Sequence, residues 1–274
     1  MSAIEDARKG SPRMSASDEI LIARDGAVLT ITLNRPEKFN ALTFGMYQKL
    51  AETCRGVTRG GDVRAIIITG AGQKAFAAGT DIGQFRAFKT PEDGLNYERN
   101  VDVILSAIEK CPVPIIAAIS GACTGGGAAI ASCCDLRIAT RDMRFGFPIA
   151  RTLGNCLSAK SLQRLSGLIG AARVTDIVFT SRLMEAAECH AAGLVSELLD
   201  DHASLMSRAT ALAQQIAGYA PLTLSTTKEL MRRLREATPA VDDHDLVAEV
   251  YTSADFREGL DAFLTKRKPV WQGR

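Results

Sequence analysis

The stretch PVPIIAAISGACTGGGAAIASCCDLRIAT, residues 112–140, decides the fold of this chain. Residues 113–119 form an apolar, β-branched run with the length and composition of a buried strand. A glycine-rich turn follows at residues 121–127, and the small residues after it predict a tightly packed helix. Residues 136–139 predict a second strand. Strand, turn, helix and strand in this order indicate an α/β chain.

Three consecutive glycines, Gly125, Gly126 and Gly127, stand between the predicted strand and helix. Glycine at such a place lets another group approach the backbone closely. The N–H groups of a helix's first turn are unpaired and lie at the positive end of its dipole. We therefore predict a backbone donor site for developing negative charge. The alternative is that these glycines serve only the packing of strand against helix.

The glycine turn does not match either common nucleotide-binding motif. A P-loop requires G-x-x-x-x-G-K-[ST]; Gly121 and Gly126 have the glycine spacing, but glycine and alanine follow in place of Lys and Ser/Thr. The dinucleotide fingerprint G-x-G-x-x-G is also missing from the turn.

Composition indicates an ordinary globular protein. A chain of 274 residues can bury one large core, or one domain with a helical appendix. With 33 basic and 31 acidic residues the net charge is +2, which favours neither a nucleic-acid nor a membrane partner. The seven cysteines contain no CxxC pair and predict reduced, buried thiols, with no metal site. The sequence shows neither an apolar run of transmembrane length nor a signal peptide, so we expect a cytoplasmic protein.

Turn and periodicity signals organise the rest of the chain, with Asp25-Gly26 as a hairpin turn and Thr90-Pro91 as a helix start. Residues 144–156 look irregular. The signals predict strands at 20–23, 28–33, 65–70 and 194–199 and helices at 43–59, 88–110, 203–218, 222–237, 242–250 and 254–267. We expect a disordered tail over residues 1–17, an α/β core over 18–200 and a helical C-terminal region over 201–274.

Five motifs, in order, resemble those of the crotonase (enoyl-CoA hydratase/isomerase) superfamily: LNRPEKFNAL (33–42), KAFAAGTDI (74–82), the central stretch (112–140), GLVSELL (193–199) and DFREGLDAFLTKRKP (255–269). The resemblance spans roughly residues 18–270. It implies a spiral of ββα units over the core and a helical C-terminal trimerisation region. It further implies an acyl-CoA thioester substrate, a role in fatty acid metabolism, and assembly as a homotrimer or dimer of trimers. Coenzyme A is then carried by the substrate, and no separate cofactor is implied.

The resemblance assigns the two backbone N–H donors of the family's oxyanion hole to Thr80 and Gly126. These amides would polarise the thioester carbonyl and hold the enolate, which agrees with the donor site inferred from the glycine turn. Each such donor is commonly worth on the order of a hundredfold or more in rate. The family usually has alanine at the position of Thr80, and the extra hydroxyl can add a hydrogen bond or crowd the thioester.

The resemblance also implies the positions that hold coenzyme A. A cation among them suits a phosphate. For Lys38 and Lys266 the alternative is a solvated charged face. The family's nucleotide loop corresponds to Arg35, Lys38 and Ala41. Its adenine and pantetheine cradle corresponds to Ala77, Gly79, Asp81 and Ile82, and its C-terminal helix positions correspond to Phe263 and Lys266.

Both glutamates that hydratases of this family use for proton transfer are replaced. The first should follow the glycine triplet by two positions, where this chain has Ala129. The second should follow FGFP (145–148), where it has Ile149, or Ala150 if the longer loop is counted from its other end.

 
Neither register, at Ile149 or at Ala150, supplies a carboxylate. Positioned acid–base groups typically contribute about a hundred- to ten-thousandfold each, so classical hydration should be nearly abolished.

Polar residues elsewhere are considered as replacements. Glu98 is a candidate for a long-range base, and Tyr97 is a second candidate that we rank below it. The alternative is that Glu98 lies on a solvated face of its helix. Arg151 and Asn155 lie on the altered loop and could orient a substrate carboxylate or a water, against the alternative of hydrogen bonds that only hold the loop.

Two functions follow from these residues. The first is a lyase, isomerase, decarboxylase or hydrolase acting on an acyl-CoA through the oxyanion hole and a nonstandard base. The second is a catalytically silent acyl-CoA-binding paralogue. Ala129 and Ile149 favour the second, whereas the glycine triplet and the polar RTLGN loop (151–155) favour the first, which we adopt.

Overall fold

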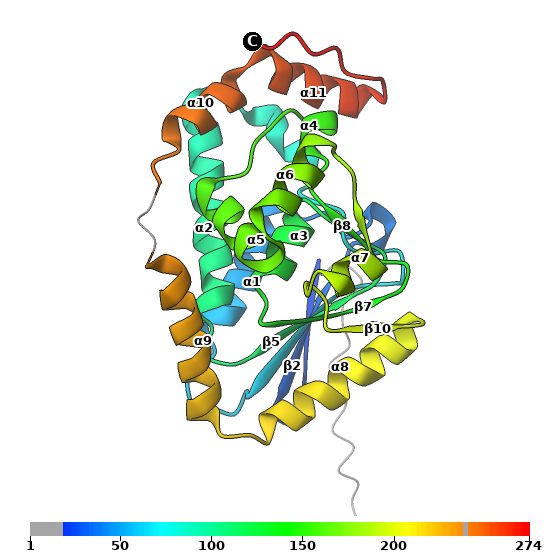
Figure 1. Cartoon of the computed structure of the whole chain (residues 1–274), viewed down its shortest axis with the longest axis vertical. Coiled ribbons are helices and arrows are strands. Elements are labelled where there is room, and N and C mark those ends of the chain that lie inside the picture. Colours follow the sequence, from blue (N-terminus) through cyan, green and yellow to red (C-terminus); the bar gives the residue numbers. More distant parts are fainter. Residues whose placement is uncertain (1–18, 238–240) are drawn as a thin grey trace, which may run out of the picture.

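The computed structural model describes residues 19–237 and 241–274 (Figure 1). Its main sheet has six strands in the order β1-β2-β3-β5-β7-β10, of which only the β1–β2 pair is antiparallel. A smaller sheet has the order β4-β6-β8-β9. The strands are β1 (Ile20–Asp25), β2 (Val28–Leu33), β3 (Ala65–Gly70), β4 (Ala75–Ala77), β5 (Ile115–Ile119), β6 (Ala122–Thr124), β7 (Leu136–Thr140), β8 (Arg144–Gly146), β9 (Met184–Glu185) and β10 (Glu197–Leu199).

A strand–strand–helix unit repeats along the core. In each unit a strand of the main sheet is followed by a short strand of the smaller sheet and then by helix: β3 and β4, β5 and β6, β7 and β8. The helices are α1 (Phe44–Arg55), α2 (Pro91–Lys110), α3 (Gly126–Cys133), α4 (Ile149–Thr152), α5 (Ala159–Ile169), α6 (Ala171–Phe179), α7 (Ala186–Ala191), α8 (His202–Ala217), α9 (Pro221–Glu236), α10 (His244–Thr252) and α11 (Ala254–Thr265), with 3-10 turns η1 (Pro36–Lys38) and η2 (Ile82–Ala87). This order confirms the predicted α/β fold with helices at its C-terminal end.

Helices cover both faces of the main sheet, which explains why its central strands are apolar at almost every position. In β3, Ile66 and Ile68 belong to the large core shared with α1 and α2. Ala65 and Ile67 point the other way and pack with α8. Figure 1 shows α8 running below the sheet, with α1 and α3 above it.

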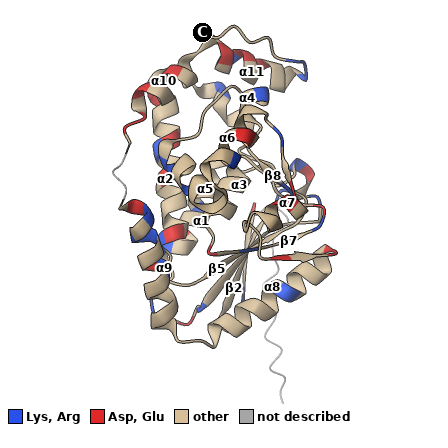
Figure 2. Cartoon of the chain, in the orientation of Figure 1, with Lys and Arg blue, Asp and Glu red and all other residues tan. Residues whose placement is uncertain are grey.

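The last two helices close one end of the molecule. α10 packs against α2, and α11 packs against η2 and α4. In Figure 1 they lie above α2 and α4, far from α8. Figure 2 shows basic and acidic residues interspersed along the outer helices. No helix in the described parts of the chain is long and apolar enough to cross a membrane.

Several local predictions are confirmed. The hairpin turns at Asp25-Gly26, where Gly26 has a φ of 55°. Thr90 caps α2 in a full capping box with Asp93. All seven cysteines are free thiols; six are buried and Cys156 is half-buried. The predicted tail, residues 1–17, lies outside the described residues.

Other boundaries were predicted wrongly. α1 ends at Arg55 and not at residue 59. Residues 144–156, expected to be irregular, contain β8 and α4, and β6 lies inside the expected glycine turn. These pieces are only three or four residues long, too short to show a hydrophobic period in the sequence. The two strands form because parallel pairing of β6 with both β4 and β8 satisfies backbone groups of each.

Candidate active site

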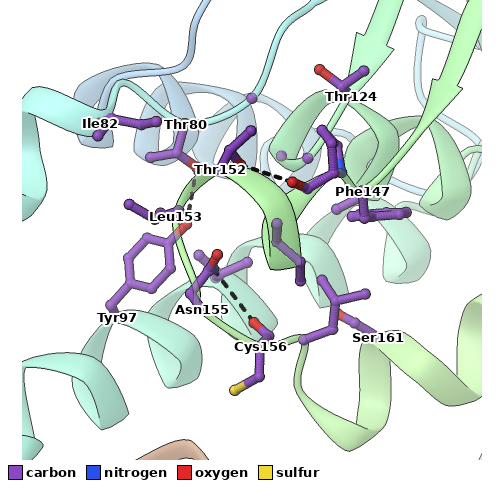
Figure 3. Close-up of a pocket in the computed structure, with 18 of the residues that line it drawn as sticks. Thr80, Ile82, Tyr97, Thr124, Phe147, Thr152, Leu153, Asn155, Cys156 and Ser161 are labelled. Carbon is purple, nitrogen blue, oxygen red and sulfur yellow. Dashed lines mark hydrogen bonds between the residues drawn. The ribbon is translucent and has the colours of Figure 1, made fainter. Parts of the chain in front are cut away.

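A cavity of about 120 Å³ lies where the loop after β4 meets the start of α3. The two segments are in close contact, since a Cβ atom on Gly125 would lie 3.3 Å from the Cα of Gly79. Thr80 and Gly126, the two predicted donors, both line the cavity. Figure 3 shows Thr80, from the loop after β4, and Thr124, the last residue of β6, on the same side of the site.

The backbone around Thr80 leaves its amide free to face the cavity. Leu42 N–H donates to the Gly79 carbonyl, and Asp81 N–H donates to the Leu42 carbonyl, both at 2.8 Å. Successive N–H groups of an extended segment point to opposite sides, so the N–H of Thr80 points away from Leu42. Gly126 is the first residue of α3 and has no acceptor within its helix.

Two glycines of the triplet make contacts that a side chain would block. A Cβ on Gly127 would lie 2.3 Å from the Ala77 carbonyl oxygen, so this glycine is needed for packing of α3 against β4. A Cβ on Gly126 would lie 1.9 Å from the hydroxyl of Tyr47, inside the cavity lining. Gly127 therefore serves the packing of α3, whereas Gly126 leaves room for the Tyr47 hydroxyl at the cavity.

The Thr80 side chain adds hydrogen bonds at the site. Its Oγ1 lies 3.0 Å from the hydroxyl of Tyr47 on α1 and 2.9 Å from the hydroxyl of Tyr97 on α2. Figure 3 shows Tyr97 reaching toward Thr80 across the cavity. Burial raises the pKa of both tyrosines above the ordinary value, so both phenols stay protonated.

Glu98 is the one carboxylate among the described residues that line this cavity. Its Oε1 accepts a hydrogen bond of 2.7 Å from the hydroxyl of Tyr251 on α10. Asn155 Nδ2 donates to that same hydroxyl at 3.3 Å. Burial raises the pKa of Glu98 to about 7; the Tyr251 hydrogen bond opposes this shift, and the negative charges of Asp102 and Asp243 add to it. The carboxyl can therefore hold or release a proton near neutral pH.

Apolar side chains occupy the positions where the resemblance places the hydratase glutamates. Ala129 and Ile149 both line the cavity. Ala150, the other register, is exposed and does not line it. Phe147 and Leu153 extend the same apolar wall, and both are drawn in Figure 3.

The structure brings only some of the predicted residues to the cavity. Arg35 instead pairs with Asp81 at 3.0 Å and with Glu19 at 3.2 Å, and donates to the Ala41 carbonyl at 2.6 Å, which braces the loop. Asn155 lines the cavity, and its Oδ1 is buried without a hydrogen-bond partner among the described atoms. The predicted residues at the cavity are Gly79, Thr80, Ile82, Glu98, Gly126, Ala129, Ile149 and Asn155. Those away from it are Arg35, Lys38, Ala41, Ala77, Asp81, Arg151, Phe263 and Lys266.

Sequence reasoning missed Tyr47 and Tyr251 and ranked Tyr97 low. The chain has four tyrosines, and these three converge around the site. Tyr47 has the spacing of a core residue on α1, and it is almost fully buried. A phenol on a buried helix face needs a hydrogen-bond partner, and this requirement is the sequence signal that could have drawn attention to Tyr47.

The sequence model of the enoyl-CoA hydratase/isomerase family matches residues 23–274. This chain belongs to the enoyl-CoA hydratase/isomerase family. The short-chain-enoyl-CoA hydratase of Clostridium acetobutylicum is 30% identical over 92% of this chain and 96% of its own length.

Solved structures agree with this membership in the enoyl-CoA hydratase/isomerase family. A methylmalonyl-CoA decarboxylase in complex with 2-nitronate-propionyl-CoA is 28% identical, with a TM-score of 0.85 over 94% of this chain and 99% of that one. An enoyl-CoA hydratase/carnithine racemase from Magnetospirillum magneticum is 35% identical, with a TM-score of 0.75 over 94% and 96%. The predicted family and fold are confirmed.

Proposed function

We propose that this protein is an enzyme that binds an acyl-CoA thioester and stabilises its enolate. The observation that carries the proposal is the meeting of two distant backbone segments, at Thr80 and Gly126, in one cavity. Two preorganised N–H donors in a partly buried site stabilise developing negative charge far better than water does. The family relatives are themselves named for acyl-CoA substrates. The cavity of about 120 Å³ suits a short acyl group, with the rest of coenzyme A outside.

Glu98 is the group that we propose to carry the proton. With a pKa near 7 it is present in both protonation states at neutral pH, as an efficient acid or base requires. Its hydrogen bond to Tyr251 holds the carboxyl in place. The two positions that carry glutamate in hydratases, Ala129 and Ile149, have no proton to give or take.

Decarboxylation of a malonyl-type acyl-CoA is the reaction that these residues support best. The bond between the α carbon and the carboxylate breaks, carbon dioxide leaves, and the electron pair forms an enolate at the thioester oxygen. No base is needed for this step. Protonated Glu98 would then deliver a proton to the α carbon and regain one from solvent. Ala129 and Ile149 present no negative charge that would repel the substrate carboxylate.

A second function is favoured by the same two residues. If no group moves the proton, the chain is a catalytically silent acyl-CoA-binding paralogue. Ala129 and Ile149 favour this alternative, whereas the placement of Glu98 favours the enzyme.

One set of assays separates these functions. The purified protein is given crotonyl-CoA, malonyl-CoA and methylmalonyl-CoA, and acyl-CoA binding is measured in the same samples. We expect binding of all three, loss of carbon dioxide from a malonyl-type substrate, and little hydration of crotonyl-CoA. Fast hydration would contradict the proposed site, and binding without any reaction would establish the silent paralogue.

The role of Glu98 is tested by Glu98→Gln, which keeps the shape of the side chain and removes the titrating proton. We expect the rate of decarboxylation to fall about a hundredfold or more, with binding retained. Glu92→Gln is the matched control, because Glu92 is exposed on the first turn of the same helix.

A further inference from the structure

Three hydroxyl groups form a row along one side of the cavity. Tyr47 Oη lies 3.0 Å from Thr80 Oγ1, which lies 2.9 Å from Tyr97 Oη. They come from α1, the loop after β4, and α2, and all three residues line the cavity. The row depends on Thr80, because its hydroxyl is the middle member.

The row can also close on itself, because Tyr47 and Tyr97 interact with each other by a side-chain hydrogen bond. Each of the three hydroxyls carries one proton and can accept from a neighbour. If the Tyr47 proton turns from Tyr97 toward the cavity, it becomes a donor there, and the two hydrogen bonds through Thr80 remain.

The row lies directly beside the two amides of the proposed oxyanion hole. A Cβ on Gly126 would lie 1.9 Å from Tyr47 Oη and 3.1 Å from Thr80 Oγ1, so both oxygens lie over this residue. Tyr97 is further away, with its ring edge-on to Phe85 and Phe88. Tyr47 is therefore the end of the row closest to Gly126.

We infer that the Tyr47 hydroxyl is a third hydrogen-bond donor to the thioester oxygen. Tyr97 donates to Thr80, Thr80 donates to Tyr47, and Tyr47 donates to the oxygen held by the amides of Thr80 and Gly126. Thr80 and Tyr97 are positioning residues in this arrangement, since they act through Tyr47. Hydrogen bonds in such a chain polarise one another and strengthen its last donor. The inference rests on the proposed function, because it requires a thioester in this cavity.

The experiment uses butyryl-CoA labelled isotopically at its carbonyl carbon, a saturated thioester that can be neither hydrated nor decarboxylated. Difference infrared spectroscopy reports the carbonyl stretching frequency of the bound probe, which falls as donors are added to its oxygen. The variants are Tyr47→Phe, Thr80→Val and Thr80→Ser. Tyr219→Phe is the control, because it removes a tyrosine hydroxyl on the surface, away from the cavity.

We expect Tyr47→Phe to raise the carbonyl frequency toward that of free butyryl-CoA and to lower the rate of the catalysed reaction about tenfold or more. Thr80→Val should give a smaller shift in the same direction, because it keeps the amide and only frees Tyr47 from its partner. Thr80→Ser should restore the frequency, and Tyr219→Phe should leave it unchanged.

Two results would overturn the inference, and they have different consequences for the proposed function. If Tyr47→Phe binds the probe with an unaltered carbonyl frequency, the hydroxyl does not touch the thioester, and the proposed function stands. If the unsubstituted protein does not bind butyryl-CoA, the proposed function fails and the inference fails with it. Should Tyr47→Phe prove unstable, Thr80→Val decides by the same readout.

Discussion

At the scale of single residues, the site depends on side chains that are missing as much as on those present. Gly126 has no side chain, and this leaves room for the Tyr47 hydroxyl beside its amide. Ala129 and Ile149 provide no carboxylate, so our proposal assigns the proton chemistry to Glu98 on another helix.

Gly126→Ala should abolish the function of the site. The new methyl group would lie 1.9 Å from Tyr47 Oη, so the buried tyrosine must move. We expect a loss of stability of about 1–3 kcal/mol, as for an overpacked core, and loss of acyl-CoA turnover. Gly167→Ala is the control, because a Cβ there meets nothing within 4 Å; it should not destabilise the protein. Thermal unfolding measures the stability of both variants, and the turnover assay measures their activity. An active Gly126→Ala protein would contradict the proposed role of Gly126 in the site.

Glu98 should make stability depend on pH. Its pKa is raised from 4.5 to about 7 in the folded protein, so between these values the folded state holds more protons than the unfolded state. The free energy of unfolding should therefore fall by up to about 3 kcal/mol as pH rises through this range, and level off above it. Urea unfolding across pH 4 to 8, roughly the window set by the shift, measures this. Glu98→Gln should remove the fall and Glu92→Gln should keep it; a fall of equal size in Glu98→Gln would refute the assignment.

At the scale of elements, α2 delivers Tyr97 and Glu98 to the cavity and is held at both ends. Its first turn is capped by Thr90 and Asp93, whose carboxylate accepts from the Thr90 N–H at 2.8 Å. At its other end Glu109 accepts from Arg164 of α5 and from Arg235 of α9, each at 2.7 Å. Arg164 and Glu109 are almost completely buried.

Glu109→Gln should be strongly destabilising, because it leaves the buried Arg164 charge without its partner. Removing one member of a buried ion pair typically costs about 3–5 kcal/mol. Urea unfolding measures the change. The exposed Arg99–Glu92 pair on the same helix provides the comparison, and Glu92→Gln should change the free energy of unfolding by less than about 1 kcal/mol. Equal effects of the two substitutions would show that burial of the pair does not matter.

At the scale of the whole molecule, the C-terminal helices have two roles. α10 brings Tyr251 to Glu98, so the helical region completes the site within one chain. α9 leaves large apolar side chains exposed, namely Leu222, Leu230, Met231 and Leu234. Such a group of exposed apolar residues is typical of a protein–protein contact, and we propose that α9 forms a contact in the homotrimer or dimer of trimers that the resemblance implies.

Met231→Glu combined with Leu234→Glu should lower the mass of the assembly in sedimentation experiments. Two charges would have to be buried without partners if α9 forms the contact between subunits. Ile22→Glu, on the edge strand β1, is the control for a charge placed on another exposed apolar residue, and it should leave the mass unchanged. A double variant with the mass of the unsubstituted protein would exclude this face of α9.

The sequence by itself determined the fold class, the family, the central glycine turn and the cap of α2. The signals behind these features are local: a buried run, a turn dipeptide or a capping residue acts on neighbours in the chain, so each signal is complete within a few residues. The family follows from five such local motifs in order. The sequence also shows that positions 129 and 149 are not glutamate.

Only the tertiary structure decided what the Thr80 hydroxyl does and that Ile149, not Ala150, faces the cavity. It also decided that Glu98 has a pKa near 7, because that value depends on burial and on Tyr251, a residue 153 positions away. The physical reason is common to all three. Hydrogen bonds and desolvation depend on distances in space, and these are set by packing of elements far apart in the chain.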